Sequence, residues 1–486
     1  DPAFWANAPL IKVDKKGGVK LKNLTKANDD GYTSLMNLID PKTTRFVLDE
    51  HYNKSFSKKP AERSKFDDEV INVTERFNIL DNTAKGYQLK IIPVQNDPSE
   101  RWTSWVYQGK ENPVEIDTMA LGMISVYFNM VSKGIETGDW RAADNAIHYI
   151  DEYQHKWGKN VVPPSKKVEI EVLYNKANIF FWIMIAYTIV GSALVILAFI
   201  QLFRESKLLR YITNFFIGLT VIVFILQAIG LGVRWYLTGH APWSNGYEAI
   251  VFISWVGVLS GLLLHKNRNA FIPATGAMVA VIMMGFAHGG SMLDPQITPL
   301  VPVLKSYWLI IHVAIIVSSY GFFGLSAVLS LFSLIIMLFR PNKKIKISLK
   351  EMAYVNEISL TIGLFLLTVG TFLGGMWANE SWGRYWSWDP KETWAFITVI
   401  VYAIVLHMRL VPGLRGLWAY NIAAMWSIWS VIMTYFGVNY YLSGLHSYAA
   451  GDPIPVPLWV YLAAIGMLIL SIVSKITYNK YHKKKK

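Results

Sequence analysis

Hydrophobic and polar positions divide the chain near residue 178. Before that point short apolar runs alternate with polar residues and turn signals, whereas after it long apolar runs follow one another. A long run can cross a hydrocarbon layer of roughly 30 Å as a helix, which satisfies its own backbone hydrogen bonds in lipid. We predict about nine such spans, at 179–203, 211–238, 247–264, 270–288, 307–339, 357–378, 393–411, 417–441 and 457–475. The predicted fold is an all-α polytopic membrane protein preceded by a polar extracytoplasmic domain.

The polar segment 1–178 is predicted to be a mixed α/β domain. Up to about residue 107 it is expected to be rich in β-strand, because stretches such as 88–93 and 103–107 lie between turn signals. From about 114 to 157 the apolar period becomes helical, and Gly138 marks the break of a helical hairpin. The first span and a cytoplasmic linker then occupy 179–210, and the main transmembrane domain occupies 211–486.

Charge gives this arrangement an orientation. The net charge is +13, but the basic residues are spread over connectors between apolar runs, which argues against nucleic-acid binding. The basic segments are 204–210, 266–268, 340–350, 409–415 and the tail 475–486; they alternate with poorly basic connectors at 239–246, 289–306, 379–392 and 442–456. Because Lys and Arg favour the cytoplasmic side, the poorly basic connectors and residues 1–178 are predicted to be external and the C-terminus cytoplasmic. The expected location is a bacterial inner membrane.

The chain contains no cysteine. It can therefore form neither a disulfide nor a thioether link to a bound group. The sequence begins at Asp1 without a Met or a signal peptide. Since the segment that follows is predicted to be external, we expect upstream sequence to be missing.

The predicted external connector at 379–392 is unusually rich in aromatic residues. With its flanks it contains Trp377, Trp382, Gly383, Arg384, Trp386, Trp388, Asp389, Lys391, Glu392 and Trp394. An interfacial aromatic belt is one interpretation, and spacing alone leaves it open. A belt needs only one or two aromatics per helix end, however. Flat aromatic surface beside charged side chains suits a large planar ligand that carries carboxylates, such as haem.

The run Trp382-Gly383-x-x-Trp386-x-Trp388-Asp389-x-Lys391-Glu392-x-Trp394 resembles the WWD signature of haem-handling proteins. It is most similar to the CcsA/ResC cytochrome c assembly family of the system II pathway. The stretch from Arg234-Trp235 to Trp255 is similar to the opening segment of that family, and the resemblance covers most of 211–475. Residues 1–178 and the first span resemble the end of the ResB/CcsB partner protein, fused ahead of CcsA as in CcsBA-type cytochrome c synthases.

Two histidines share the predicted external face with the tryptophans. His312 lies about one turn inside the external end of a span, and His446 lies in the connector 442–456. A histidine near a helix end is often structural. The resemblance nevertheless implies that this pair ligates the iron of non-covalent, ferrous haem b above a platform of the WWD residues. Arg384 is the candidate partner of a haem propionate.

His407 lies near the cytoplasmic end of the span that follows the tryptophan connector, beside Arg409. Ionisable residues within a membrane suggest function, although a histidine at the boundary is the plain alternative. The resemblance implies that His407 ligates a second haem within the membrane. Its partner is expected on the ResB/CcsB-like transmembrane half, which is missing upstream in this sequence.

Three further histidines have weaker contexts. His240 is expected to be structural or to support a ligand, His288 lies at an external helix end as an alternative ligand, and His265 lies at a cytoplasmic boundary.

The resemblance implies a cytochrome c biogenesis protein. It would bind haem, present it at the outer face and promote its thioether attachment to the Cys-x-x-Cys-His segment of apocytochrome c, with thiol-reducing proteins as further partners. Two alternatives stay open. One is a haem exporter or chaperone that attaches nothing, and the other is a secondary transporter that binds no haem. A transporter would show broken helices and internal repeats, and the two halves show no clear repeat.

Overall fold

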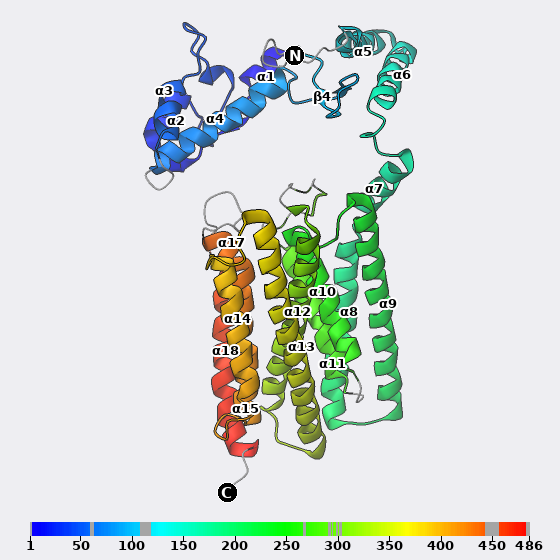
Figure 1. The fold of residues 1–486 in the computed structure, drawn as a ribbon, viewed down its shortest axis with the longest axis vertical. Helices are drawn as coiled ribbons and strands as arrows, with labels where there is room; N and C mark the ends of the chain where they lie inside the picture. Colours follow the sequence, from blue (N-terminus) through cyan, green and yellow to red (C-terminus); the bar gives the residue numbers. More distant parts are fainter. Residues whose placement is uncertain are drawn as a thin grey trace. The chain divides into compact units, whose positions relative to one another are not determined.

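The computed structural model describes residues 2–58, 63–106, 118–265, 269–289, 293, 295–297, 300, 304–442 and 456–482. The chain divides into two compact units, Asp1–Ser165 and Lys166–Lys486. In Figure 1 the first unit is coloured blue to cyan, and the helices of the second run from cyan through green to red.

The first unit is mainly helical where it is described. Its helices are α1 (Pro2–Asn7), α2 (Gly18–Thr25), α3 (Asp49–Phe56), α4 (Lys65–Ala84), α5 (Thr118–Thr137) and α6 (Arg141–Trp157), with 3-10 turns at Lys15–Gly17 and Met36–Leu38. Strand β1 (Ile11–Lys12) pairs antiparallel with β2 (Tyr32–Thr33), and β3 (Ile92–Pro93) pairs with β4 (Trp102–Thr103). α5 and α6 form a helical hairpin that breaks at Gly138, whose φ is +75°.

The described part of the region up to residue 107 differs from the expected strand-rich structure because α4 dominates it. Ser64 and Asp67 form a capping box that starts this helix. Val70, Val73 and Phe77 then follow at helical spacing and are buried in the core of the unit. The helical spacing of these buried residues, together with the cap, therefore makes this stretch a helix despite the turn signals on either side.

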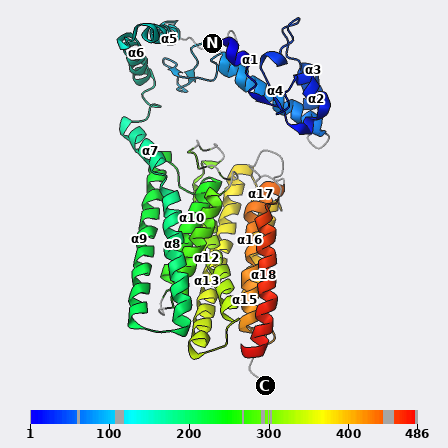
Figure 2. The same ribbon diagram turned by 180° about the vertical axis from the view of Figure 1, so that it is seen from behind.

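The second unit is a bundle of long helices (Figures 1 and 2). After α7 (Ser165–Ala177) come α8 (Ile179–Phe203), α9 (Lys207–Thr238), α10 (Gly246–Leu263), α11 (Phe271–His288), α12 (Tyr307–Ile336), α13 (Lys343–Trp382), α14 (Pro390–His407), α15 (Leu417–Trp426), α16 (Ile428–Ile432), the π-turn η6 (Met433–Gly437), α17 (Val438–Tyr441), α18 (Leu458–Thr477) and the π-turn η7 (Tyr478–His482). The predicted all-α polytopic fold is confirmed.

Eight helical segments among the described residues are long and apolar enough to cross a membrane. They correspond to eight of the nine predicted spans. The ninth, predicted at 393–411, is helical as α14 and runs alongside the others in Figure 1. α14 is less apolar than the other eight segments because its first turn contains Lys391 and Glu392, which lower its mean hydropathy.

Small residues allow the helices of the bundle to approach closely. α10 packs on α11, and a Cβ added at Gly261 would lie 3.0 Å from the Cα of Gly276. α12 packs along α13 in the same manner. Association of helices in lipid depends on such close van der Waals packing, since apolar contact with the lipid tails is equally favourable.

Candidate functional site

A cavity of about 560 Å³ lies at the end of the bundle where α10 begins and α13 ends. Its walls come from α10, α12, α13, α14 and the π-turn η6, which are far apart in the sequence. Most lining side chains are apolar or aromatic, with a few polar groups among them. This volume and composition are typical of a pocket for a large organic ligand.

His312 projects from α12 into this cavity and is held in one orientation. Its Nδ1 lies 2.7 Å from the carbonyl oxygen of Gly370 on α13. A carbonyl can only accept, so Nδ1 carries the proton and Nε2 carries the lone pair of the neutral ring. A hydrogen bond of this kind fixes the tautomer of metal-ligating histidines.

Two glycines of α13 make room for the α12 side chains. A Cβ added at Gly374 would lie 2.4 Å from Cε1 of His312, and one at Gly370 would lie 2.4 Å from Cγ1 of Ile316. Gly370 and Gly374 are four residues apart and therefore share one helix face. The sequence signal is a small-x-x-x-small pair, but its relation to His312 becomes visible only when the helices are paired.

The tryptophans of the connector divide into two groups. Trp377 is 1% exposed, and it lines the cavity together with Trp386. Trp382 packs against Trp377 at a ring-centroid distance of 4.7 Å but is not part of the cavity wall. Trp388 also lies outside the wall and is 68% exposed. Trp394 lies in α14, outside the wall, and its carbonyl accepts hydrogen bonds from neighbouring threonines.

Backbone conformation explains why Trp386 and Trp388 differ. Residues two apart in an extended segment would share a face. Trp388 instead has a φ of +61°, which turns the chain, and the two rings meet at 89°. Gly383, with a φ of +70°, ends α13 through its N–H bond to Asn379.

A capping box fixes the start of α14 beside the cavity. Asp389 is the N-cap, its Oδ2 accepting from the N–H of Lys391, and Oε2 of Glu392 accepts from the backbone N–H groups of Ser387 and Asp389. These bonds hold the connector against the helix that follows it. Asp389 and Glu392 thus order the loop.

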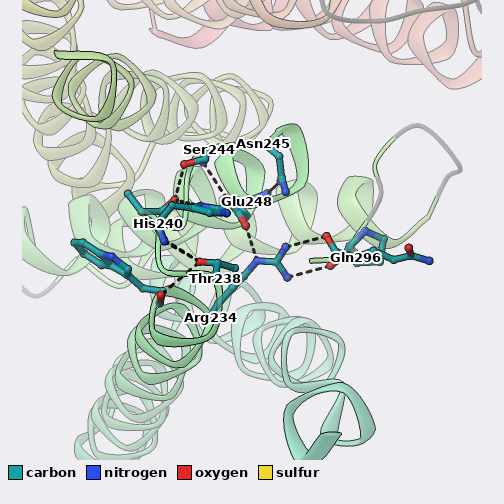
Figure 3. Close-up of polar contacts among 10 residues, drawn as sticks. Arg234, Thr238, His240, Ser244, Asn245, Glu248 and Gln296 are labelled. Atoms are coloured by element: carbon teal, nitrogen blue, oxygen red, sulfur yellow. Dashed lines mark hydrogen bonds and ion pairs between the residues drawn. The ribbon is translucent and has the colours of Figure 1, made fainter. Parts of the chain in front are cut away.

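An ion pair buried where α9 ends and α10 begins supports the opposite wall (Figure 3). The Nε of Arg234 donates to Oε1 of Glu248 over 2.8 Å, and its two terminal nitrogens donate to the carbonyls of Pro295 and Gln296 over 3.0 and 3.3 Å. The second oxygen of Glu248 accepts from the N–H of Ser244 over 2.9 Å. Ser244 and Gln296 line the cavity, so this cluster holds two separate wall segments together.

Two further contacts close the wall. The indole N–H of Trp243 donates to the carbonyl of Ile310, two residues before His312. The π-turn η6 supplies Thr434 and Tyr435, and the Tyr435 hydroxyl donates to the carbonyl of Gly246 over 3.1 Å. π-turns are frequent at functional sites, and no pattern along the chain predicts this one.

The other candidate histidines that the structure describes lie apart from the cavity wall. His240 and His288 are not among its lining residues, and Nδ1 of His288 donates to the carbonyl of Met284. His265 lines a second, more polar cavity of about 600 Å³ at the opposite end of the bundle, where burial lowers the pKa of its imidazole. His446 falls within 443–455, outside the described residues.

His407 is at the far end of α14 from the tryptophan connector. The helix begins at Pro390, so at about 1.5 Å per residue His407 is roughly 25 Å from the cavity end. Its exposed ring donates from Nδ1 to the carbonyl of Ala403 over 2.7 Å, which leaves the lone pair on Nε2. The two predicted haem positions are therefore on separate ends of the bundle.

Fold and site together define a polytopic helical membrane protein with an aromatic, histidine-bearing cavity at one end of its bundle. Residues 243–446, which include almost all of the cavity wall, match the family model described as Cytochrome C assembly protein. The chain belongs to the cytochrome c assembly family that includes CcsA, and the family predicted from the WWD run is confirmed.

Three relatives show how far the similarity extends. The chain is 34% identical over 275 residues to the cytochrome c biogenesis protein CcsA of Guillardia theta, covering 51% of this chain and 88% of that protein. It is 36% identical over 270 residues to the CcsA protein of Solanum lycopersicum, with 48% and 84% covered. It is also 36% identical over 462 residues to the protein NrfI of Wolinella succinogenes, which covers 94% of this chain but only half, 50%, of that protein.

Proposed function

We propose that this chain binds haem in the cavity, with His312 as an axial ligand, and promotes haem attachment to the Cys-x-x-Cys-His segment of an apocytochrome c. The observation that carries the proposal is the placement of His312. Its imidazole lines an aromatic cavity and Nδ1 donates to the Gly370 carbonyl, so the lone pair of the neutral ring is on Nε2, the nitrogen that would bind iron.

The residues present fit a haem-sized group. The cavity of about 560 Å³ has flat indole surface at Trp377 and Trp386. Gly374 leaves the space that the His312 ring occupies, and a side chain there would collide with it. Neutral imidazole is a common axial ligand of haem iron. His446 remains the predicted second ligand.

The chain's own residues contribute by positioning. His312 would hold the iron, the indoles of Trp377 and Trp386 would support the flat face of the ligand, and the apolar wall would limit access of water. Bound haem supplies two vinyl groups, across whose C=C bonds the thiol S–H groups of the substrate add without a further oxidant. Among the described residues that line the cavity, none forms a nucleophile–base pair, which agrees with a positioning role.

Orientation belongs to the proposal. We infer that the cavity end of the bundle is external. In support, the basic connector after α8 and the basic start of α13 lie at the opposite end, with the end of α18 (Figure 1). Lys and Arg favour the cytoplasmic side.

His407 is proposed as a ligand on the cytoplasmic side. Its ring is exposed on α14, and Nδ1 is held by Ala403, so Nε2 is oriented for a group outside the bundle. A second ligand there would come from a ResB/CcsB-like transmembrane segment.

An absorption spectrum tests the proposal directly. The detergent-purified chain would be compared with His312→Ala, His446→Ala and, as a matched external control outside the cavity wall, His288→Ala. We expect a reduced low-spin haem spectrum that becomes high-spin in the first two variants and returns with added imidazole, whereas His288→Ala keeps it. Protein isolated from haem-replete cells without any haem would contradict the proposal and favour a transporter that binds no haem.

A second experiment separates attachment from export. The chain would be expressed with a ResB/CcsB-like partner and a Cys-x-x-Cys-His apocytochrome, and the apocytochrome would be examined for haem that survives denaturation. Covalent haem that depends on His312 supports attachment. Haem that reaches the outer face but stays extractable supports a chaperone instead.

A further inference from the structure

The tryptophan connector and the start of α14 carry two cationic side chains, Arg384 and Lys391, and only Lys391 lines the cavity. Arg384, expected from the sequence to meet a propionate, does not line the cavity. Its guanidinium lies over the ring of Trp382 at 5.6 Å and 3.8 Å from Oε1 of Glu392. The guanidinium of Arg384 is therefore directed to Trp382 and Glu392 rather than into the cavity.

Lys391 lies on the other side, within the cavity wall. Its Nζ donates to Oδ1 of Asn439 on α17 over 2.7 Å and lies 6.0 Å from the centre of the Tyr435 ring. An ammonium group carries three N–H donors, and Asn439 accepts one of them. The capping box fixes the backbone from which the side chain extends.

The balance of charge in the wall favours an anion at this point. Lys391 and Glu392 are the charged residues among the described residues of the wall. Glu392 is directed to the connector, since Oε2 accepts from two backbone N–H groups and Oε1 faces Arg384. The positive end of the α14 dipole adds to the charge of Lys391.

We propose that Lys391, held by Asn439, is the residue that binds a carboxylate of the cavity's planar ligand. This inference rests on the proposed function, in which that ligand is haem and the carboxylate is a propionate. It assigns a fixed orientation to the ligand, with the carboxylate edge toward α14 and α17 and the remaining edges against the apolar wall.

The test compares two ligands that differ only in their carboxylates. Haem and haem dimethyl ester would be titrated into the full-length, haem-depleted chain in detergent, and binding followed by the low-spin absorption band. We expect wild type to prefer haem over the ester. Lys391→Met is expected to lower the affinity for haem about tenfold or more while leaving the affinity for the ester nearly unchanged.

Matched variants complete the design. Lys391→Arg keeps a cation and is expected to retain most of the preference, whereas Lys305→Met removes an exposed lysine outside the wall and should keep all of it. Should Lys391→Met not fold, Lys391→Gln carries the same test, because it removes the charge but keeps a donor for Asn439.

Three outcomes decide the matter. Loss of the preference in Lys391→Met and Lys391→Gln, but not in Lys305→Met, supports the inference. A preference that survives in Lys391→Met and Lys391→Gln, or that disappears in Arg384→Gln instead, overturns it. If wild type gives no low-spin band with either compound, the proposed function itself fails, which is distinguishable from a failure of this inference.

Discussion

The imidazole of His312 and the backbone of Gly370 form a hydrogen bond of 2.7 Å that joins α12 to α13. The same helix face presents Gly374, where a Cβ would lie 2.4 Å from the ring. Position, tautomer and rotamer of His312 are thus set by one neighbouring helix. Mutating the residues that hold a metal-ligating histidine in place typically lowers metal affinity or activity about 10- to 100-fold.

Gly374→Ala should therefore displace the imidazole without removing it. We expect a low-spin haem spectrum to become partly high-spin and haem affinity to fall about tenfold or more. Absorption spectra with and without added imidazole provide the measurement. Gly466→Ala is the matched control, since a Cβ there meets nothing within 4 Å; equal spectra in the two variants would contradict the role given to Gly374.

Truncation of Trp386 and truncation of Trp388 should change haem affinity by different amounts. Trp386→Ala removes an indole from the cavity wall, and we expect haem affinity to fall about tenfold, as the loss of one aromatic contact of roughly 1.5 kcal/mol implies. Trp388→Ala truncates a ring that is 68% exposed and outside the wall, so its effect should be smaller. Titration of haem into both variants measures this, and a larger effect of Trp388 would argue for a platform outside the cavity.

The Arg234–Glu248 pair should be important for stability as well as for the cavity. Arg234 is 2% exposed, and its removal leaves a buried carboxylate, at a cost of about 3–5 kcal/mol. We expect Arg234→Met to lower the thermal unfolding temperature in detergent markedly and to weaken haem binding, because Ser244 and Gln296 lose their common support.

Arg210→Met offers a control on the same helix. Arg210 pairs with Glu205 where both side chains are more than half exposed, so its removal should change the unfolding temperature much less. Similar shifts in both variants would show that the buried pair has no special role.

Acid should weaken the first unit through Asp67. Hydrogen bonds from Lys58 and Ser64 hold the pKa of this carboxyl well below its ordinary value. The unfolded carboxyl titrates near about 3.9, so the contribution of Asp67 is fully present above that pH and is lost as the pH falls toward the lower folded pKa.

Hydrogen exchange of α3 and α4 amides in the full chain, corrected for the intrinsic rate at each pH, measures this effect. We expect protection to decrease below about pH 4 in wild type. Asp67→Asn should lower protection at neutral pH by about 1–2 kcal/mol and flatten the pH dependence. An unchanged pH dependence in the variant would assign the acid sensitivity to other groups.

Local pattern was sufficient for the architecture of the second unit. A long apolar run in lipid can satisfy its own backbone hydrogen bonds only as a helix, so length and hydropathy located the eight helices that are apolar enough to cross a membrane, and also α14 as a helix. The WWD run was informative for a different reason, because a dense local arrangement of Trp, Gly and charge has few alternative uses.

The first unit was harder to predict. The capping box of α4 and the turn signals near it favour different structures, and a pattern within one segment does not show which of the two prevails.

The sequence by itself determined which helices form the bundle and which connector carries the family motif, since both depend on residues close together in the chain. Tertiary structure alone decided that His312 rests on Gly370 and Gly374, that Trp386 faces the cavity while Trp388 does not, and that Lys391 rather than Arg384 enters the wall. Each of these depends on a helix pairing or a single backbone φ. Such contacts join positions tens to hundreds of residues apart, and no periodicity along the chain records them.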